Sequence, residues 1–149
     1  MKKIVLAGIA LFILNALNAQ VAVKWYTIEE AYALSKKEPR KILVDVYTDW
    51  CGWCKVMDRN TYSNEVIADY INKTFYAVKF NAEQKGDVLL NGKTYKLVQN
   101  GNRSYNQFAY ELLKGQLGYP STVFLDEQAN VIEPVQGYIK PVEFDQILK

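Results

Sequence analysis

The two cysteines of this chain are separated by only two residues. Cys51 and Cys54 enclose Gly52 and Trp53, and they follow an apolar run over residues 41–47 that is typical of a buried strand. Two thiols at this spacing, where a strand turns into a helix, can close a small ring that forms and opens reversibly. The pair therefore predicts thiol–disulfide exchange.

The composition excludes several other chemistries. The 149 residues include no histidine, which excludes Ser-His-Asp and Cys-His catalysis and any zinc site with a histidine ligand. Two cysteines cannot supply a four-thiolate zinc site either, so we expect no metal and no cofactor. The net charge is only +2, and Lys2 and Lys3 alone account for this excess, so we expect no binding to nucleic acid.

The first 19 residues have the order of charged, apolar and small residues that is typical of a secretory signal peptide. Lys2 and Lys3 precede an apolar stretch that is shorter than the roughly 20 residues of a membrane-spanning helix. We expect cleavage after Ala19 and no stable membrane insertion afterwards. The expected organisation is a signal peptide over residues 1–19 and one domain over residues 20–149, in the periplasm or, as a second choice, secreted.

A purely structural disulfide is the alternative interpretation of the cysteine pair. Exported proteins commonly contain structural disulfides, often several. A crosslink between Cys51 and Cys54 would close a very short loop, which removes little conformational entropy from the unfolded chain. The spacing therefore favours a redox role over a structural one.

Helices and strands alternate along the rest of the chain. The expected helices cover residues 27–37, a segment after the cysteines to about residue 59, and residues 65–73, 107–114 and 141–148. The expected strands cover residues 41–47, 75–81, 121–125 and 131–136, with a further hairpin that joins residues 88–90 to 94–98 and another turn at residues 100–102. This order predicts an α/β fold with a mixed central sheet flanked by helices.

The two cysteines differ in their expected roles. Cys51 begins a helix, where free backbone N–H groups favour a thiolate and can lower a cysteine pKa from about 8.5 to roughly 3.5–7.5. We expect Cys51 to be the attacking sulfur. Cys54 lies one turn deeper, and we expect it to be less exposed and to act as the resolving thiol.

Asp45 places a charge inside the apolar strand that precedes the cysteines. Burial of this carboxylate costs several kcal/mol unless it keeps a proton or gains a partner. A carboxyl group with a raised pKa could take a proton from Cys54 as that thiol attacks. The alternative is an aspartate on an edge strand that faces water, and the residues alone leave both possibilities open.

From about Lys41 to Lys149 the chain resembles the thioredoxin superfamily, and the run from Asp49 through Trp50, Cys51 and Cys54 to Lys55 looks like its active site. Residues 47–51 with 61–64 are also similar to the periplasmic C-terminal domain of the transmembrane disulfide reductase. The resemblance implies a thioredoxin-like fold with an insertion at residues 82–117, before a cis-proline loop. Its departure from the family is Gly52-Trp53 in place of the usual Gly-Pro.

The resemblance also assigns roles to residues away from the cysteines. It implies that Asp45 is a buried carboxyl and that Lys79 is its partner, although a solvated strand lysine is a close alternative. It implies that Tyr119 and Pro120 form the cis-proline loop, which would present backbone to a substrate strand, and that Gly137 lines the same groove.

Two tryptophans, Trp50 and Trp53, flank the cysteines, and we expect them to face outward as an apolar rim for a protein partner. The aromatic residues of the insertion are expected to pack within it rather than to form a cofactor pocket; they are Tyr95, Tyr105, Phe108 and Tyr110.

The sequence as a whole predicts an exported, monomeric disulfide reductase. Trp53 brings no positive charge between the cysteines to stabilise a thiolate, and together with Asp45 this favours a domain that donates electrons. Its substrates would be disulfides of envelope proteins, and a membrane electron donor would reduce it again. The alternatives are an oxidase or isomerase, or a non-catalytic module that binds partners through Trp50, Trp53 and Tyr119.

Overall fold

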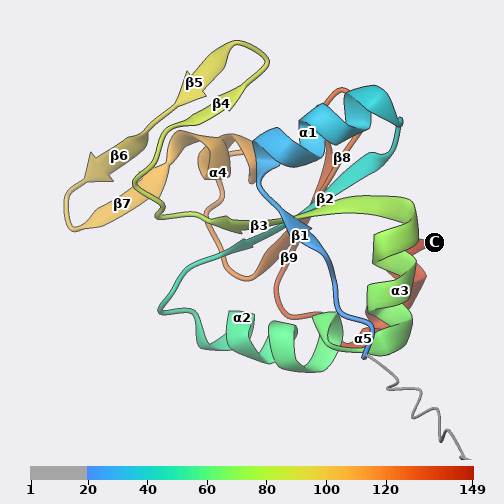
Figure 1. Ribbon diagram of the computed structural model, residues 1–149. Coiled ribbons are helices and arrows are strands. Elements are labelled where there is room, and N and C mark those ends of the chain that lie inside the picture. The colour runs from blue at the N-terminus through green and yellow to red at the C-terminus, as the bar shows by residue number, and fades with distance from the viewer. Residues whose placement is uncertain (1–19) are drawn as a thin grey trace, which may run out of the picture.

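The computed structural model describes residues 20–149, so the expected signal peptide over residues 1–19 lies outside the described part of the chain. A five-stranded sheet forms the centre of the domain, with helices on both of its faces (Figure 1). No helix within residues 20–149 is long and apolar enough to span a membrane.

The strands of the central sheet are β1 (Trp25–Tyr26), β2 (Lys41–Tyr47), β3 (Phe75–Asn81), β8 (Ser121–Leu125) and β9 (Val131–Gln136). The helices are α1 (Ile28–Lys37), α2 (Gly52–Met57), α3 (Glu65–Thr74), α4 (Gln107–Leu112) and α5 (Pro141–Leu148), and a π-helical turn, η1 (Asp58–Tyr62), continues α2. Two hairpins lie outside the central sheet: β4 (Val88–Leu90) with β5 (Lys93–Tyr95), and β6 (Leu97–Asn100) with β7 (Arg103–Asn106).

The central sheet has the strand order β1-β3-β2-β8-β9. The first three of these strands are parallel, whereas β8 runs antiparallel to β2 and β9 antiparallel to β8. The predicted α/β fold with a mixed sheet is therefore confirmed. The two-residue strand β1 was not expected, because a segment this short has no measurable periodicity.

Local sequence signals account for the element boundaries next to the site. The Thr27 hydroxyl accepts a hydrogen bond from the Glu30 backbone N–H, and the Glu30 carboxylate accepts one from the Thr27 N–H, so a capping box starts α1. Pro39 follows the end of this helix, where its missing N–H cannot continue the helical hydrogen bonds. After the cysteines the α-helix ends at Met57 rather than near residue 59, because the chain widens there into η1.

Strand β2 is buried on both faces of the sheet. Ile42, Val44 and Val46 pack into the apolar cluster under α1 and α4. Leu43 belongs to the other cluster, with α3 and α5, and the alternation of side chains along a strand directs Asp45 to that same face. Because β2 is paired on both sides, Asp45 is not an edge residue, and the alternative that it faces water is wrong.

The insertion differs in detail from the expected single hairpin. The expected strand over residues 94–98 is interrupted at Lys96, whose backbone N–H and C=O both bond to Gln107 at the start of α4. Two hairpins result, and the turn expected at residues 100–102 joins β6 to β7. Helix α4 ends at Leu112 rather than at residue 114, and the chain turns away through Gly115, which has a φ of +82°.

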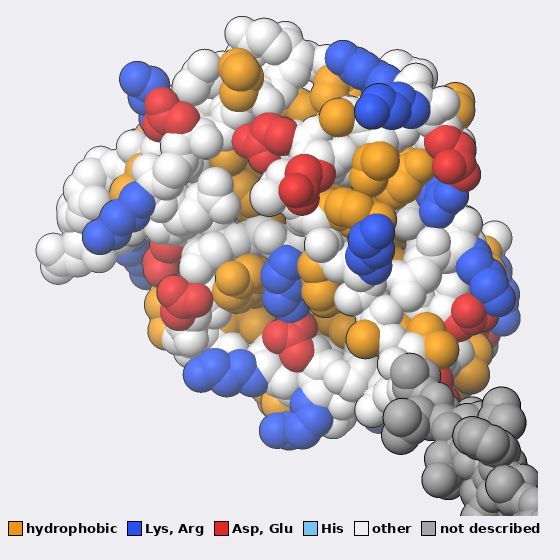
Figure 2. All heavy atoms as spheres, in the orientation of Figure 1, with side chains coloured by type: hydrophobic (Ala, Val, Ile, Leu, Met, Phe, Trp, Pro, Cys, Tyr) orange, Lys and Arg blue, Asp and Glu red, His pale blue; other side chains and the backbone are white. Residues whose placement is uncertain are grey.

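Acidic and basic side chains are interspersed on one face of the domain. On the face shown in Figure 2, Lys and Arg side chains lie beside Asp and Glu side chains rather than gathering by sign. This face therefore provides no extended field of one sign that would attract a polyanion.

Asn106 connects the insertion to the rest of the domain, and its replacement tests that connection. The buried side chain accepts a hydrogen bond from the Phe108 N–H and donates one to the Gly86 carbonyl, while its backbone N–H bonds to Ala82. We expect Asn106→Ala to lower the free energy of unfolding by about 2 kcal/mol, because it removes a helix cap and leaves buried groups unpaired. Urea unfolding measures this loss. The control Asn102→Ala, at an exposed position, should change the free energy of unfolding by less than about 0.5 kcal/mol. Equal losses of stability in both variants would contradict the role of Asn106 in connecting the insertion to the domain.

Candidate active site

The cysteine pair lies where β2 passes into α2. Cys51 and Cys54 form a disulfide with Cα atoms 5.3 Å apart. Cys51 is the N-cap of α2, and its Sγ accepts a hydrogen bond of 3.1 Å from the Cys54 backbone N–H. When the disulfide is reduced, a thiolate on Cys51 would be favoured by this donor.

The exposure of the two cysteines differs from the expectation. Each residue is only 4% exposed, so the prediction that Cys54 is less exposed than Cys51 is wrong for the disulfide-bonded state. In the disulfide-bonded state both residues are therefore buried to the same extent. Their difference lies in the helix geometry, because Cys51 is the cap and Cys54 is inside the first turn.

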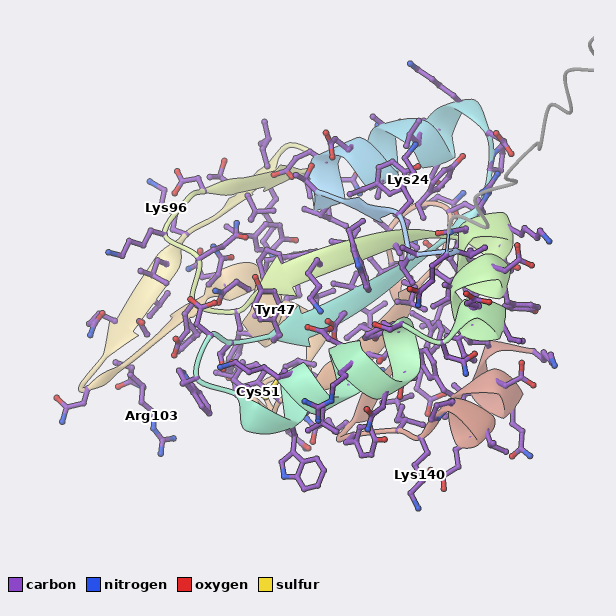
Figure 3. All side chains as sticks on the ribbon, turned by 60° about the horizontal axis from the view of Figure 1, so that its bottom comes forward. Lys24, Tyr47, Cys51, Lys96, Arg103 and Lys140 are labelled. Atoms are coloured by element: carbon purple, nitrogen blue, oxygen red, sulfur yellow. A yellow bond between two sulfur atoms is a disulfide. The ribbon has the colours of Figure 1, made fainter. Side chains whose placement is uncertain are left out.

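Aromatic side chains form a rim around the disulfide. Trp50 and Trp53 are 67% and 62% exposed, which confirms that they face outward. The Trp50 indole donates to both carboxylate oxygens of Glu83, at 3.1 Å each, and packs edge-on against Tyr119 with ring centroids 5.9 Å apart. Trp53 stacks on Tyr138 at 5.6 Å. Figure 3 shows Cys51 at the start of α2, at the bottom of that view.

The loop before β8 lies beside this rim. The Tyr119–Pro120 peptide bond is cis, as the resemblance implied. Gly137 donates its N–H to the Pro120 carbonyl at 2.8 Å, and its φ of +98° is one that glycine adopts without strain. A hollow of about 200 Å³ lies between these residues and the stacked Trp53 and Tyr138. The structure thus brings together the residues predicted to bind substrate, and their binding role stays a prediction.

Asp45 is a buried carboxyl group with an ion-pair partner on the next strand. It is 1% exposed, and the strand register places it between Lys79 of β3 and Thr122 of β8. The Lys79 Nζ lies 2.6 Å from Asp45 Oδ2. Within the described residues, the other oxygen, Oδ1, has no hydrogen-bond partner. The implied pairing of Asp45 with Lys79 is therefore present.

The environment of Asp45 changes its protonation. Burial raises the pKa of Asp45 to about 6, against the opposing attraction of Lys79. Burial also disfavours the charge on Lys79, but attraction to Asp45 and hydrogen bonds to its carboxylate partners raise the pKa of Lys79 overall. Asp45 therefore exchanges its proton near neutral pH, which is the property required of a proton acceptor for a thiol.

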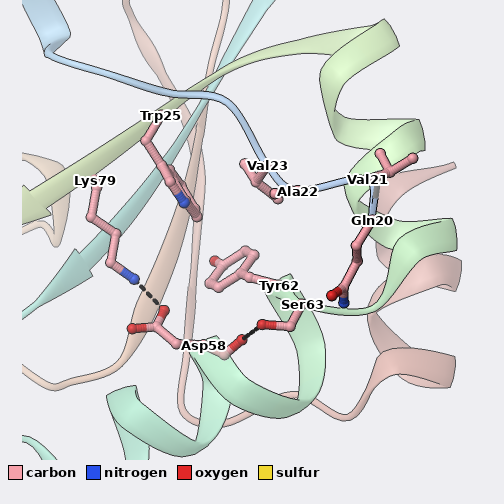
Figure 4. A pocket seen from close by; sticks show the side chains of 9 residues that line it. All are labelled: Gln20, Val21, Ala22, Val23, Trp25, Asp58, Tyr62, Ser63 and Lys79. Atoms are coloured by element: carbon pink, nitrogen blue, oxygen red, sulfur yellow. Dashed lines mark hydrogen bonds and ion pairs between the residues drawn. The ribbon is translucent and has the colours of Figure 1, made fainter. Parts of the chain in front are cut away.

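Two further residues join this group, and the sequence analysis missed both of them. Asp58 forms a second ion pair with Lys79, drawn in Figure 4. The buried hydroxyl of Tyr62 lies 3.0 Å from the Thr122 hydroxyl, and burial raises the pKa of Tyr62 well above its ordinary value. The position of Asp58, four residues after Cys54, could have indicated its place on the next helical turn. Tyr62 lies in the run 61–64 that carries part of the family resemblance, but nothing in the sequence indicated that its hydroxyl enters this group, because η1 determines its direction.

Lys79 also borders a hollow on the surface. This hollow has a volume of about 480 Å³ and is lined by residues 20–23 and by the side chains of Trp25, Asp58 and Tyr62 (Figure 4). The Lys79 ammonium lies 5.0 Å from the centre of the Trp25 ring. The side chain of Lys79 is 23% exposed, so the partner of the buried carboxyl group is in contact with solvent.

The chain was compared with known families and curated proteins. The family model described as "Thioredox_DsbH: Protein of unknown function, DUF255" matches residues 10–146. The uncharacterized protein B0495.5 of Caenorhabditis elegans is 27% identical over 121 residues, which are 80% of this chain and 14% of that protein. The thiol:disulfide interchange protein DsbD of Photorhabdus laumondii is 23% identical over 137 residues, which are 91% of this chain and 20% of DsbD. The chain thus spans a fifth or less of the length of these relatives.

Solved structures with the same fold include a thioredoxin from Thermus thermophilus, with a TM-score of 0.63, 19% identity and coverage of 85% of each chain. A structure described as DsbH Oxidoreductase has a TM-score of 0.61 and 19% identity, and the match covers 96% of this chain and 92% of that one. These similarities show that the fold is thioredoxin-like.

The raised pKa of Asp45 predicts a specific dependence of stability on pH. The folded state holds the Asp45 proton more tightly than the unfolded state, whose pKa is near 3.8, so the protein loses stability as the pH rises from about 4 to beyond 6. Asp45→Asn removes this loss, and Lys79 keeps Asp58 as a partner. We expect the free energy of unfolding of Asp45→Asn, relative to that of the wild type, to increase by about 3 kcal/mol as the pH rises across this range. The reason is that one pKa unit corresponds to about 1.4 kcal/mol.

Urea unfolding of the oxidised wild type and of Asp45→Asn at several pH values measures this difference. Asp69→Asn is a matched control, because it removes an exposed carboxylate of the same type in an i,i+4 ion pair. Parallel stability curves for wild type and Asp45→Asn would contradict the raised pKa.

Proposed function

The chain belongs to the family described as Thioredox_DsbH, DUF255, and on this basis we propose that it is an exported thiol–disulfide oxidoreductase that reduces disulfides in other envelope proteins. The observation that carries the proposal is the Cys51–Cys54 disulfide, with Cys51 as the N-cap of α2 between an exposed aromatic rim and a cis-proline loop. The similarity to DsbD, a thiol:disulfide interchange protein, supports the same chemistry.

The proposed reaction begins with the reduced pair. The Cys51 thiolate attacks one sulfur of a substrate disulfide, so a mixed disulfide forms and the other substrate sulfur leaves as a thiolate that takes up a proton. Asp45 accepts the proton of the Cys54 thiol, and the Cys54 sulfur then attacks Cys51. The mixed disulfide breaks, the second substrate sulfur leaves as a thiolate and takes up the proton that Asp45 holds, and two electrons have passed from the cysteine pair to the substrate.

The other groups of the site support these steps. Trp50 and Trp53 offer apolar surface to the partner, and Tyr119, Pro120 and Gly137 line the hollow where an extended substrate segment would lie. Lys79 acts as a positioning residue, because it holds one oxygen of Asp45 and leaves the other without a partner in the described chain.

The cellular setting is part of the proposal. The export signal expected over residues 1–19 would deliver a monomeric domain to the periplasm. An oxidising compartment supplies no soluble reductase of its own, so a membrane electron donor would restore the dithiol after each cycle.

The groups around the cysteines support the proposed direction of electron flow. Trp53 brings no positive charge to the pair, and the charge of Lys79 is shared by two carboxylates. A thiolate in such a place is only weakly stabilised, which favours release of electrons to a substrate.

Removing the resolving thiol should trap substrates. In Cys54→Ser, Cys51 can still attack but nothing releases the mixed disulfide, so we expect disulfide-linked complexes with envelope proteins on non-reducing gels. The double variant Cys51→Ser/Cys54→Ser is the matched control and should give none. An absence of complexes from Cys54→Ser cells would contradict the exchange cycle, and capture of the same partners by the double variant would instead support a binding module.

The reduction potential distinguishes a reductase from an oxidase. We expect equilibration with glutathione redox buffers to give a reduction potential similar to that of thioredoxin, about −270 mV, because the Cys51 thiolate has little stabilisation. A value near about −120 mV, typical of a strong oxidant, would contradict the reductase direction and leave the exchange chemistry in place.

A further inference from the structure

A second hollow lies next to the cysteine site, between the domain and the insertion. We call it the insertion cleft; it has a volume of about 630 Å³, with Trp50 and Tyr119 on the domain side and Arg103, Tyr105 and Tyr110 on the insertion side. Tyr119 also borders the cis-proline hollow, so the two hollows meet at this one side chain. A segment that leaves the cis-proline hollow past Tyr119 therefore enters the insertion cleft.

The insertion side of the cleft is held in place by packing and hydrogen bonds. Tyr105 and Tyr110 stack with ring centroids 5.4 Å apart. Gly115 makes room for Tyr110, because a Cβ at this position would lie 3.1 Å from the Tyr110 hydroxyl oxygen. Asn106 fixes the base of the β6–β7 hairpin by its bonds to Gly86 and Ala82. The cleft is therefore formed before any partner arrives, which lowers the entropic cost of binding.

The cleft has an apolar inner part and a cationic outer edge. Trp50, Tyr110 and Leu117 are among the exposed large apolar side chains. Arg103 is exposed, and it takes part in no ion pair within residues 20–149. Figure 3 shows Arg103 reaching from its hairpin on the same lower side of the molecule as Cys51.

Among the described residues, the one carboxylate that lines the cleft is Glu83, which lies at the start of the insertion beside Trp50 and away from Arg103. It accepts both hydrogen bonds from the Trp50 indole, and its charge adds to the effect of burial in raising the pKa of Tyr119. An acidic group would be repelled near Glu83 and attracted near Arg103. The charges thus define an orientation for an occupant, with its apolar part at Trp50 and its carboxylate at the hairpin.

We propose that the insertion cleft binds the polypeptide segment beside the reactive disulfide of a protein substrate, and that Arg103 selects segments with an acidic side chain beyond an apolar one. This inference rests on the proposed function and adds a substrate class to it. The guanidinium group presents donors in a planar fork that matches a carboxylate, and Trp50 and Tyr110 provide the apolar contact.

Two peptides test the proposal with the full-length mature protein. Both carry a disulfide next to a tyrosine, and they differ only in an aspartate or a lysine a few residues further on. We expect wild type to reduce the aspartate peptide faster, and Arg103→Gln to lower kcat/KM for that peptide by about three- to fivefold, the size of one exposed ion pair. Arg103→Glu should reverse the preference between the peptides.

Two controls separate the cleft from the catalytic chemistry. Lys96→Gln makes the same charge change on an exposed residue of the insertion outside the cleft, and it should leave the preference unchanged. Reduction of hydroxyethyl disulfide, which is small and uncharged, should be equal in all variants. An unchanged preference in Arg103→Gln and Arg103→Glu would overturn the proposal.

A binding measurement keeps the cleft testable if exchange fails. If the wild-type protein reduces neither hydroxyethyl disulfide nor either peptide, the proposed function is contradicted. In that case the Kd of the aspartate peptide, with serine in place of its cysteines, decides the question. A Kd raised about three- to fivefold in Arg103→Gln supports the cleft, and an equal Kd overturns it.

Discussion

The burial of one carboxyl group, Asp45, is the constraint on which the site depends. The strand that carries it is covered on both faces, so its charge is removed from water, and Lys79 is its ion-pair partner among the described residues. A buried carboxylate with an ion pair at one oxygen and no partner at the other is destabilising in its charged form. The cost appears as a pKa raised to about 6, and this same shift is what the proposed proton acceptor of Cys54 would require. In the proposed function, the burial that lowers stability at Asp45 thus also prepares this carboxyl group for proton transfer.

The sheet topology explains why the insertion lies beside the cysteines. Strands β2 and β3 are parallel, so their carboxyl ends meet at the same edge of the sheet. The end of β2 leads to Cys51, and the end of β3 leads into the insertion, where the Ala82 N–H bonds to the Tyr47 carbonyl. Any segment inserted after β3 therefore starts within reach of the site. The two hairpins form sheets of their own outside the central sheet, so they would extend the proposed binding surface without taking part in the central strand pairing.

The sequence predicted the elements whose signals are local or strongly periodic. The apolar run of β2, the capping box of α1 and the cysteine spacing each depend on neighbouring residues, and all three are present. Features that depend on distant partners were missed. Lys96 ends a strand because its backbone bonds to Gln107, and Tyr62 enters the site only because η1 widens the helix. The relative exposure of Cys51 and Cys54 was mispredicted because the burial of a helix N-cap depends on the residues packed around it, which the sequence does not reveal.

The charges near the cysteines bear on the energetics of exchange. Lys79 is the cation of this group, and Asp45 and Asp58 both pair with it, so the three side chains carry a net negative charge when both carboxyl groups are ionised. Asp58 follows α2 directly, and Asp45 faces the same side of the sheet, so this charge lies behind the helix that begins at Cys51. A negative environment disfavours a thiolate and partly cancels the stabilisation from the Cys54 N–H. A less stabilised thiolate would make the dithiol a better electron donor, so the charges of Asp45 and Asp58 support the proposed reduction of a substrate disulfide.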